Sequence, residues 1–276
     1  MRFTKAHGLG NDFIIMDDRA NAVKANAALA KRLCHRRTGV GADGLILVRP
    51  SETCDARMVI FNSDGSEAEM CGNGVRCFAK YVFDKGIVNK ESFSVETLAG
   101  PMVISVSVEN GVATAARVDM GVPESRRPFI PMQGEGECRL EKLTVLGREF
   151  TFSTILLGVP HTVVFVDEIP PYEELCRYGA AIETLPLFPR KTNVNFTRVM
   201  DDKNLEVRTW ERGCGATLAC GTGSSSAAVC AAMAGFTGRR VRVHLELGAL
   251  DIDQEQNGHV FMTGPAAFAY EGEVEV

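Results

Sequence analysis

The sequence predicts an α/β protein of the α+β type, built from two pseudo-symmetric lobes that each wrap a mixed, mostly antiparallel β-sheet on a central helix. Three observations predict this fold. The length of 276 residues exceeds the usual size of one compact core. The chain contains an ordered internal repeat, and in both copies helix-forming residues give way to alternating strand patterns. We expect a pseudo-twofold axis to relate the lobes.

Each copy of the repeat begins with a glycine-led turn that leads into an apolar, strand-like run. The run reads GNDFIIMD from Gly10 and GVPHTVVFVD from Gly158. Downstream, each copy carries Cys-Gly-x-Gly followed by helix-forming residues, at Cys71 and at Cys220. The glycine and the cysteine are 71 − 10 = 61 positions apart in the first copy and 220 − 158 = 62 in the second. We infer that the halves are copies of one unit.

The second part of each copy predicts antiparallel strands. Alternating segments follow both helices, SFSVETLAGPMVISVSV at 92–108 and RRVRVHLELGALDID at 239–253. Each is followed by an Asn-Gly pair, a strong signal for a tight turn between strands. These pairs lie 110 − 71 = 39 and 257 − 220 = 37 positions beyond the cysteines, so the order and spacing of the repeat are kept to its end.

The lobe boundary is expected near residues 119–121, where a strand pattern gives way to the Pro and Gly of GVPESRRPF. The alternating tail FAYEGEVEV at 268–276 is expected to return to the first lobe. The first lobe is therefore predicted to comprise residues 1–118 and 265–276, with Cys71. The second lobe is predicted to comprise residues 119–264, with Cys220.

Composition excludes several classes of protein. The chain is 45% hydrophobic and 24% charged, which is average globular usage, and no apolar stretch reaches the roughly 18 residues that a membrane span needs. A net charge of −5 offers no basic surface for nucleic acid. No secretory signal is apparent, so we expect a cytoplasmic protein whose nine cysteines stay reduced. The sequence leaves open whether the chain forms a homodimer.

Two motifs suggest sites that we do not expect. GVGADG at 39–44 has the spacing of a dinucleotide-binding turn, but a helix-like stretch precedes it and the apolar run LILV follows, whereas that turn needs a strand before it and a helix after it. Cys71 and Cys77 lack a second ligand pair at zinc-finger spacing. We therefore predict neither a nucleotide site nor a metal site.

The paired cysteines predict a proton-transfer site in a cleft between the lobes. Inverting a carbon centre requires the removal of a proton from one face and its replacement on the other, which a thiolate and a thiol can perform together. A cysteine at a helix N-terminus has a lowered pKa, so one of the two can rest as the thiolate. A single Cys-Gly-x-Gly more often marks a tight turn with a buried thiol, but two matched copies favour a pair of catalytic groups.

The residues after each cysteine predict a carboxylate site. Glycines let backbone N–H groups at a helix start approach a small anion closely, and the helix dipole favours negative charge there. We therefore expect Gly72, Asn73, Gly221 and Thr222 to bind the carboxylate next to the inverted carbon. These contacts would also stabilise the charge that develops as the proton leaves, so we predict no cofactor.

The chain resembles the diaminopimelate epimerase family over nearly its whole length. The resemblance lies in HGLGNDF at 7–13, TGVGADG at 38–44, FNSDGSEAEMCGNGVRC at 61–77, PH at 160–161, NVNF at 193–196 and ERGCGATLACGTG at 211–223. It implies two similar lobes around a cleft, a cysteine pair as acid and base, and no pyridoxal phosphate. It also implies epimerisation of LL- to meso-diaminopimelate, a step toward lysine and peptidoglycan.

The resemblance also implies roles for further residues. Substrate contacts would come from Asn11, Asn62, Asn193, Glu211 and Arg212. Arg212 would bind the distal carboxylate, and Glu211 would bind an ammonium group. Glu211 and His161 would tune the two thiol pKa values. From the residues alone, a solvated Glu211-Arg212 pair, a structural His161 and turn-forming asparagines remain alternatives.

One position departs from the family pattern. Many members carry Asn in a GNPH motif, where this chain has Val159, which offers no hydrogen bond. A related racemase of another amino acid, such as histidine or glutamate, therefore remains an alternative. So do an isomerase with other acid-base groups, of the kind found in phenazine biosynthesis, and a small-molecule binding protein without catalysis.

Overall fold

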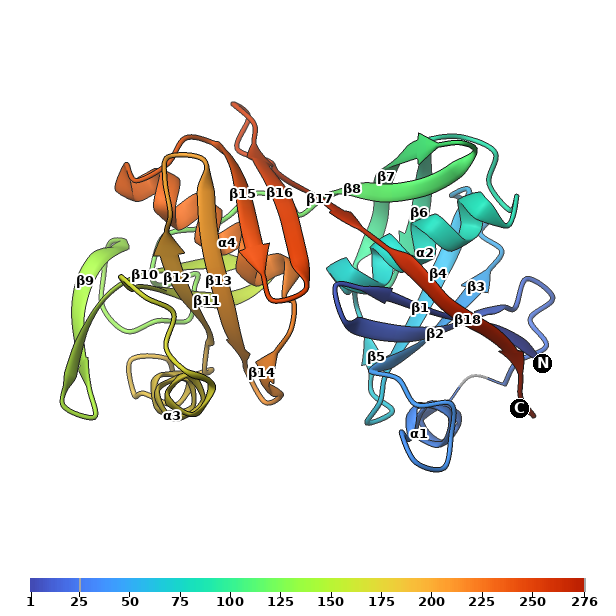
Figure 1. Ribbon diagram of the computed structural model, residues 1–276, viewed down its shortest axis with the longest axis horizontal. Coiled ribbons are helices and arrows are strands. Elements are labelled where there is room, and N and C mark those ends of the chain that lie inside the picture. Colours follow the sequence, from blue (N-terminus) through green and yellow to red (C-terminus); the bar gives the residue numbers. More distant parts are fainter. Residues whose placement is uncertain (25, 276) are drawn as a thin grey trace. The chain divides into compact units, whose positions relative to one another are not determined.

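The computed structural model describes residues 1–24 and 26–275 and divides into two compact units (Figure 1). Unit 1 comprises Met1–Asp119 and the chain from Thr263 onward, and unit 2 comprises Met120–Met262. The chain therefore leaves unit 1 once and returns to it. Val276, in the segment predicted to complete the first lobe, lies outside the described residues. Both units combine helices with mixed β-sheet, which confirms the predicted fold class.

Unit 1 contains two helices, α1 (Ala27–Cys34) and α2 (Gly72–Asp84). Its strands are β1 (Arg2–Gly8), β2 (Asn11–Asp17), β3 (Gly44–Arg49), β4 (Ala56–Asn62), β5 (Glu67–Ala68), β6 (Ser92–Thr97), β7 (Gly100–Glu109), β8 (Val112–Asp119) and β18 (Ala267–Glu273). Strands β2 and β3 are parallel, as are β4 and β6, whereas β1 is antiparallel to both β2 and β18. Figure 1 shows β18 alongside β1.

Unit 2 contains α3 (Tyr172–Glu183) and α4 (Gly221–Ala234). Its strands are β9 (Cys138–Val145), β10 (Arg148–Leu157), β11 (Val159–Phe165), β12 (Asn193–Val199), β13 (Asn204–Glu211), β14 (Gly215–Thr217), β15 (Arg240–Leu245) and β16 (Gly248–Gln254). Strand β17 (Val260–Pro265) spans the return to unit 1. No helix within the described part of the chain is long and apolar enough to cross a membrane.

The two units share one pairing scheme, as the repeat predicts. The parallel pairs β2–β3 and β4–β6 correspond to β11–β12 and β13–β15, and the antiparallel pair β1–β18 corresponds to β10–β9. The register of β3–β4 agrees with that of β12–β13 residue by residue. Ile46 lies opposite Ile60 in unit 1, and Asn195 lies opposite Thr209 in unit 2. The offset is 195 − 46 = 149, which also separates the two cysteines (220 − 71 = 149).

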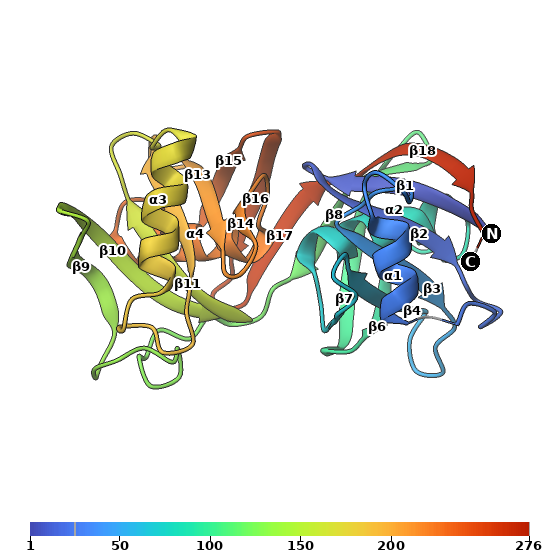
Figure 2. The same ribbon diagram turned by 90° about the horizontal axis from the view of Figure 1, so that it is seen from below.

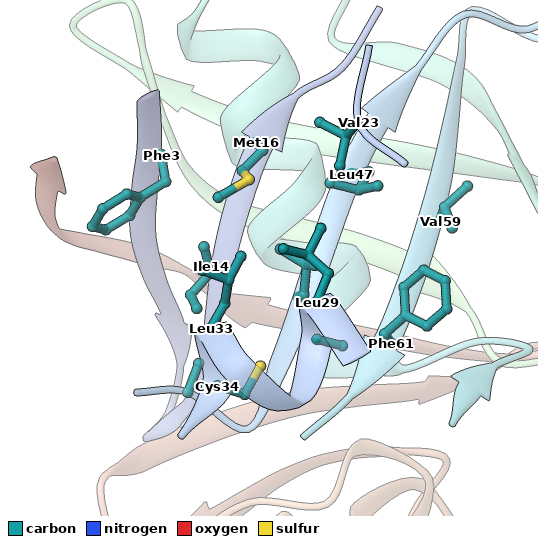
Figure 3. Packing of buried hydrophobic residues seen from close by; sticks show 13 residues of the cluster. Phe3, Ile14, Met16, Val23, Leu29, Leu33, Cys34, Leu47, Val59 and Phe61 are labelled. Carbon is teal, nitrogen blue, oxygen red and sulfur yellow. The ribbon is translucent and has the colours of Figure 1, made fainter. Parts of the chain in front are cut away.

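In each unit, one helix packs against one face of the sheet and a second helix packs against the other face. In unit 1, alternate residues of β2 and β3, such as Ile14 and Leu47, pack against Leu29 and Leu33 of α1 (Figure 3). Figure 2 shows α1 lying over the strands of this sheet. The opposite face of these strands packs against α2. In unit 2, alternate residues of β12 pack toward α3, while α4 covers the other face. Because side chains alternate between the faces of a strand, every second residue is directed toward the central helix.

The two Asn-Gly pairs lie in turns between strands, as predicted. Asn110 and Gly111 join β7 to β8 with φ values of 52° and 80°, the left-handed conformation of a two-residue hairpin turn. Asn257 and Gly258 lie in the turn between β16 and β17, where the Gly258 φ is 92°. The segment GVGADG at 39–44 lies in the loop between α1 and β3, and its last residue is the first of β3. It therefore follows a helix and leads into a strand, as predicted.

Candidate active site

The predicted site residues of each unit lie at one end of its sheet. In unit 1, β2 begins at Asn11, and β4 ends at Asn62, which lies opposite the first residue of β3. In unit 2, β12 begins at Asn193 and β13 ends at Glu211. The topology therefore gathers these polar side chains at the strand ends from which the central helices start.

Cys71 is the N-cap residue of α2. Its backbone is extended, with φ −142° and ψ 117°, and its Sγ accepts a hydrogen bond from the Gly74 N–H at 3.5 Å. The side chain is half-buried. The sulfur thus lies at the positive end of the helix dipole, with the N–H groups of Gly72 and Asn73 in the first turn behind it. This arrangement can hold a small anion next to the thiol.

A chain of side-chain hydrogen bonds supports Cys71. The Asn11 Oδ1 accepts hydrogen bonds from the Cys71 Sγ at 3.9 Å and from the Asn73 Nδ2 at 3.1 Å. The Asn73 Oδ1 in turn accepts from the Arg76 guanidinium at 2.9 Å. Burial lowers the pKa of Arg76, an effect that Cys77 and Cys71 oppose electrostatically. A buried cation close to Cys71 favours negative charge in this part of unit 1.

Asp43 orients Asn11 within this network. Its Oδ2 accepts a hydrogen bond from the Asn11 Nδ2 at 2.8 Å, and its Oδ1 accepts from the Arg36 guanidinium at 2.7 Å. The neighbouring Asp12 is ion-paired with Lys5 and with Arg36. Burial raises the pKa of Asp12, but hydrogen bonds from Arg36 and Lys5 outweigh it and hold the pKa far below its ordinary value. Asp43 accepts from the Asn11 Nδ2 and so leaves the amide oxygen of Asn11 directed at Asn73 and Cys71.

Cys220 is the N-cap residue of α4 and has a different environment. Its Sγ accepts from the Gly223 N–H at 3.4 Å and lies 3.4 Å from the Thr222 Oγ1. The residue is only 5% exposed. Burial raises the pKa of this thiol well above its ordinary value, and the Glu211 carboxylate raises it further. The helix start alone would lower the pKa of a cysteine, so at Cys220 burial and Glu211 dominate.

A buried polar network lies beneath the start of α4. The Asn195 Oδ1 contacts Gly223 and accepts a hydrogen bond from the Thr209 Oγ1 at 3.0 Å, and the Asn195 Nδ2 lies 3.2 Å from the His161 Nδ1. His161 is fully buried, and burial, followed by the charge of Arg212, lowers its pKa to about 3. The imidazole is therefore neutral. Its Nε2 has no hydrogen-bond partner among the described residues.

The equivalent positions of unit 1 are apolar. Ile46 and Ile60 occupy the places of Asn195 and Thr209, and their Cδ1 atoms are the nearest neighbours of an added Cβ at Gly74. The two units thus place a cysteine on the same backbone feature but surround it differently. Cys71 has a buried cation nearby, whereas Cys220 has a carboxylate and a polar network.

The remaining predicted residues of unit 2 form a connected group. The Glu211 Oε1 accepts a hydrogen bond from the Thr217 hydroxyl at 2.6 Å. Asn193 is buried, and its amide donates to the Pro160 carbonyl and accepts from the Arg212 N–H, both at 2.9 Å. The Arg212 guanidinium donates to the Arg190 carbonyl at 2.9 Å. Asn193 therefore positions the backbone that carries Arg212.

Hydrogen bonds connect most of the predicted residues within each unit, and the same networks include residues that were not predicted. Asn62 is the exception, because it is exposed and its amide donates to the Ser66 hydroxyl at 2.9 Å, outside these networks. Four residues of these networks were not predicted from the sequence: Asp43, Arg76, Asn195 and Thr209. One signal was available: Asn193 and Asn195 alternate in the otherwise apolar run NVNF, which places both on one face of the strand. Within the described residues, no group of three or more acidic, His or Cys side chains could hold a metal ion.

Comparison with known proteins identifies relatives of similar length. The diaminopimelate epimerase of Pelotomaculum thermopropionicum is 47% identical over 278 aligned residues, which cover 99% of this chain and 98% of that protein. The diaminopimelate epimerase of Desulfitobacterium hafniense is 48% identical, with 99% and 97% covered.

Solved structures with the same fold are more distant in sequence. A phenazine biosynthesis protein of the PhzF family from Bacillus anthracis matches with a TM-score of 0.70 at 16% identity, covering 100% of this chain and 99% of that one. A probable proline racemase from Agrobacterium radiobacter K84 matches with a TM-score of 0.71 at 15% identity, covering 100% and 93%. At these identities the similarity concerns the fold alone.

The family comparison covers both halves of the repeat. The diaminopimelate epimerase family model matches residues 3–125 and 153–269, which include both cysteine motifs. Together with relatives that are 47–48% identical over almost the whole chain, this match shows that the chain belongs to the diaminopimelate epimerase family.

Proposed function

We propose that the chain epimerises LL-2,6-diaminopimelate to meso-diaminopimelate, by proton transfer at the α-carbon between Cys71 and Cys220. The observation that carries the proposal is the pair of cysteines, each the N-cap of the equivalent helix in the two units, with opposite electrostatic surroundings. The relatives named diaminopimelate epimerase support the choice of substrate. The product serves lysine and peptidoglycan synthesis, and we expect the reaction in the cytoplasm, where thiols stay reduced.

The proposed step assigns one proton transfer to each sulfur. Cys71, near the buried Arg76 cation, acts as the thiolate and removes the α-proton of the LL isomer, so that a C–H bond breaks and an S–H bond forms. Cys220, which burial and Glu211 keep protonated, donates its proton to the opposite face of the same carbon. The two sulfurs then hold exchanged protonation states, and proton exchange with solvent restores them.

The helix starts would stabilise the reacting group. We assign the α-carboxylate to the N–H groups of Gly72, Asn73, Gly221 and Thr222, because charge spreads onto this carboxylate as the proton leaves. The step uses only side chains and backbone amides of the chain. We assign the distal carboxylate to Arg212 and an ammonium group to Glu211.

Further substrate contacts are assigned to Asn11, Asn62 and Asn193. The contacts of Asn193 with Pro160 and Arg212 support a positioning role. His161 would act on Cys220 through Asn195, as a neutral hydrogen-bonding group.

The proposal is tested by turnover in D₂O. We expect LL-diaminopimelate to yield the meso isomer with deuterium at the inverted carbon. Cys71→Ser and Cys220→Ser should each lower kcat by about 10²- to 10⁴-fold, the usual worth of a general acid or base. Cys54→Ser in unit 1 and Cys176→Ser in unit 2 serve as controls, and circular dichroism checks that every variant folds.

Three outcomes would contradict the proposal at different levels. Near-normal kcat in either Cys71→Ser or Cys220→Ser would refute the two-thiol mechanism. Labelling of histidine, glutamate or lysine but not of diaminopimelate would favour a racemase of another amino acid, the alternative that Val159 raises. No label in any of these amino acids would refute the enzymatic function.

A further inference from the structure

Unit 2 contains a cavity of about 510 Å³ beside Arg212. Two of its lining residues are arginines, Arg190 and Arg212. The rest of the lining is apolar, with Phe129, Leu156 and Val159 among its side chains. A concave apolar site with a few convergent polar groups is the usual form of a small-molecule site.

The two arginines bring positive charge that the protein leaves without a counterion. Within the described residues neither guanidinium forms an ion pair, whereas Arg148 and Arg198 elsewhere in unit 2 pair with glutamates. The Arg212 Nη1 donates to the Arg190 backbone carbonyl at 2.9 Å, which holds Arg212 against the backbone of Arg190, and the exposed Arg190 lines the same cavity. The cavity is therefore suited to an anion, and a planar guanidinium matches a carboxylate best.

The apolar lining indicates which kind of ligand would bear the anionic group. Val159 provides no hydrogen-bonding group, so ligand recognition in this part of the cavity depends on charge and on contact with methylene groups. The volume exceeds that of a carboxylate alone and leaves room for part of an aliphatic chain. A carboxylate at the end of a flexible methylene chain fits both properties.

We propose that Arg190 is a specificity-determining residue that binds the distal carboxylate of the substrate together with Arg212. This inference rests on the proposed function and extends it, because Arg190 adds a second guanidinium where Val159 supplies no polar contact. Amino acids that lack a distal carboxylate lose both contacts. The chain thereby selects dicarboxylic over monocarboxylic amino acids of similar length.

Steady-state kinetics of Arg190→Gln test the assignment. We expect the KM for LL-diaminopimelate to rise about tenfold, the loss of one charge-assisted contact, with kcat within about twofold of the wild type. Arg190→Lys should fall between the two, since it keeps the charge but loses the planar fork. Arg239→Gln, which removes an exposed arginine outside the cavity, should leave both constants unchanged. A KM for Arg190→Gln equal to that of Arg239→Gln would overturn the proposal.

Calorimetry separates this inference from the proposed function. If the wild type does not turn over LL-diaminopimelate, the proposed function fails, and the role of Arg190 is then decided by the binding of pimelate. This probe has the same carbon chain and both carboxylates but no amino groups. A dissociation constant about tenfold weaker for Arg190→Gln than for Arg239→Gln would support the carboxylate site. Equal affinities, or no binding by the wild type, would refute it.

Discussion

At the scale of single residues, the orientation of the Asn11 amide depends on the side chain of Asp43. Asn11 has an oxygen and a nitrogen that differ only in hydrogen bonding, so its partners decide which atom is directed at Cys71. The Asp43 Oδ2 accepts from the Asn11 Nδ2, which leaves the Asn11 Oδ1 directed at Asn73 and Cys71. We therefore expect Asp43 to be a positioning residue that acts on the thiol through Asn11.

Asp43→Asn should remove this preference while keeping the fold. The new amide can present its own N–H₂ to Asn11, which would turn the Asn11 nitrogen toward Cys71. An N–H directed at the sulfur stabilises the thiolate and so makes it a weaker base. We expect kcat to fall about tenfold, with a changed pH profile of kcat. Asp55→Asn, at an exposed loop of unit 1, is the matched control. An unaltered pH profile in Asp43→Asn would argue against a positioning role.

The residues that could be predicted from the sequence are those that the repeat makes visible. Cys71 and Cys220 stand at equivalent positions in two copies, so the repeat alone predicts that they act as a pair. Asp43 lies in the loop whose spacing resembles a dinucleotide-binding turn, and its role depends on a contact with Asn11, 43 − 11 = 32 positions away. Hydrogen bonds between distant segments leave no periodic signal in a sequence, so contacts of this kind required the structure.

At the scale of elements, α2 and α4 start with the same glycine pattern but have different tolerance for change. A Cβ at Gly223 would clash with the Asn195 Oδ1, which Thr209 and His161 hold in place. A Cβ at Gly74 would meet the Ile60 Cδ1 at 2.9 Å, and this atom is the mobile end of a side chain. The polar network beneath α4 therefore makes its start the more rigid of the two.

Gly223→Ala should lower the free energy of unfolding by about 1–3 kcal/mol, the usual effect of overpacking. Gly74→Ala should change it by less than about 1 kcal/mol, because Ile60 can move and alanine favours the helix. Urea titrations followed by circular dichroism measure both values, each variant serving as the control for the other. Equal losses would mean that the network containing Asn195 adjusts as readily as an isoleucine.

At the scale of the whole molecule, unit 2 is one continuous stretch of chain and unit 1 is not. Strand β18 pairs with β1 along its length, from Arg2 opposite Glu273 to His7 opposite Ala267. Its counterpart in unit 2 is β9, which directly precedes β10 in sequence. The repeat could predict that both units have this strand. The alternating tail could predict a return to the first lobe, but its partner strand could only be known from the structure.

Ending the chain after Ala266 should destabilise unit 1 selectively. The truncation removes β18, leaves β1 as an unpaired edge and deletes the contact between Phe268 and Tyr81. We expect thermal unfolding to separate into two transitions, with unit 1 melting first and unit 2 near the wild-type temperature. Calorimetry measures the transitions, and the segment 120–262 expressed alone identifies that of unit 2. One cooperative transition in the truncated chain would contradict this expectation.

Because β18 pairs with β1, the sheet of unit 1 cannot be completed until the last strand has been synthesised. Residues 267–273 are synthesised after all of unit 2, so the part of the protein that begins first is completed last. A nascent chain therefore carries β1 with an open edge for the time needed to translate more than half of its length. Until β18 is made, this edge exposes unpaired backbone groups of the kind that pair with other chains.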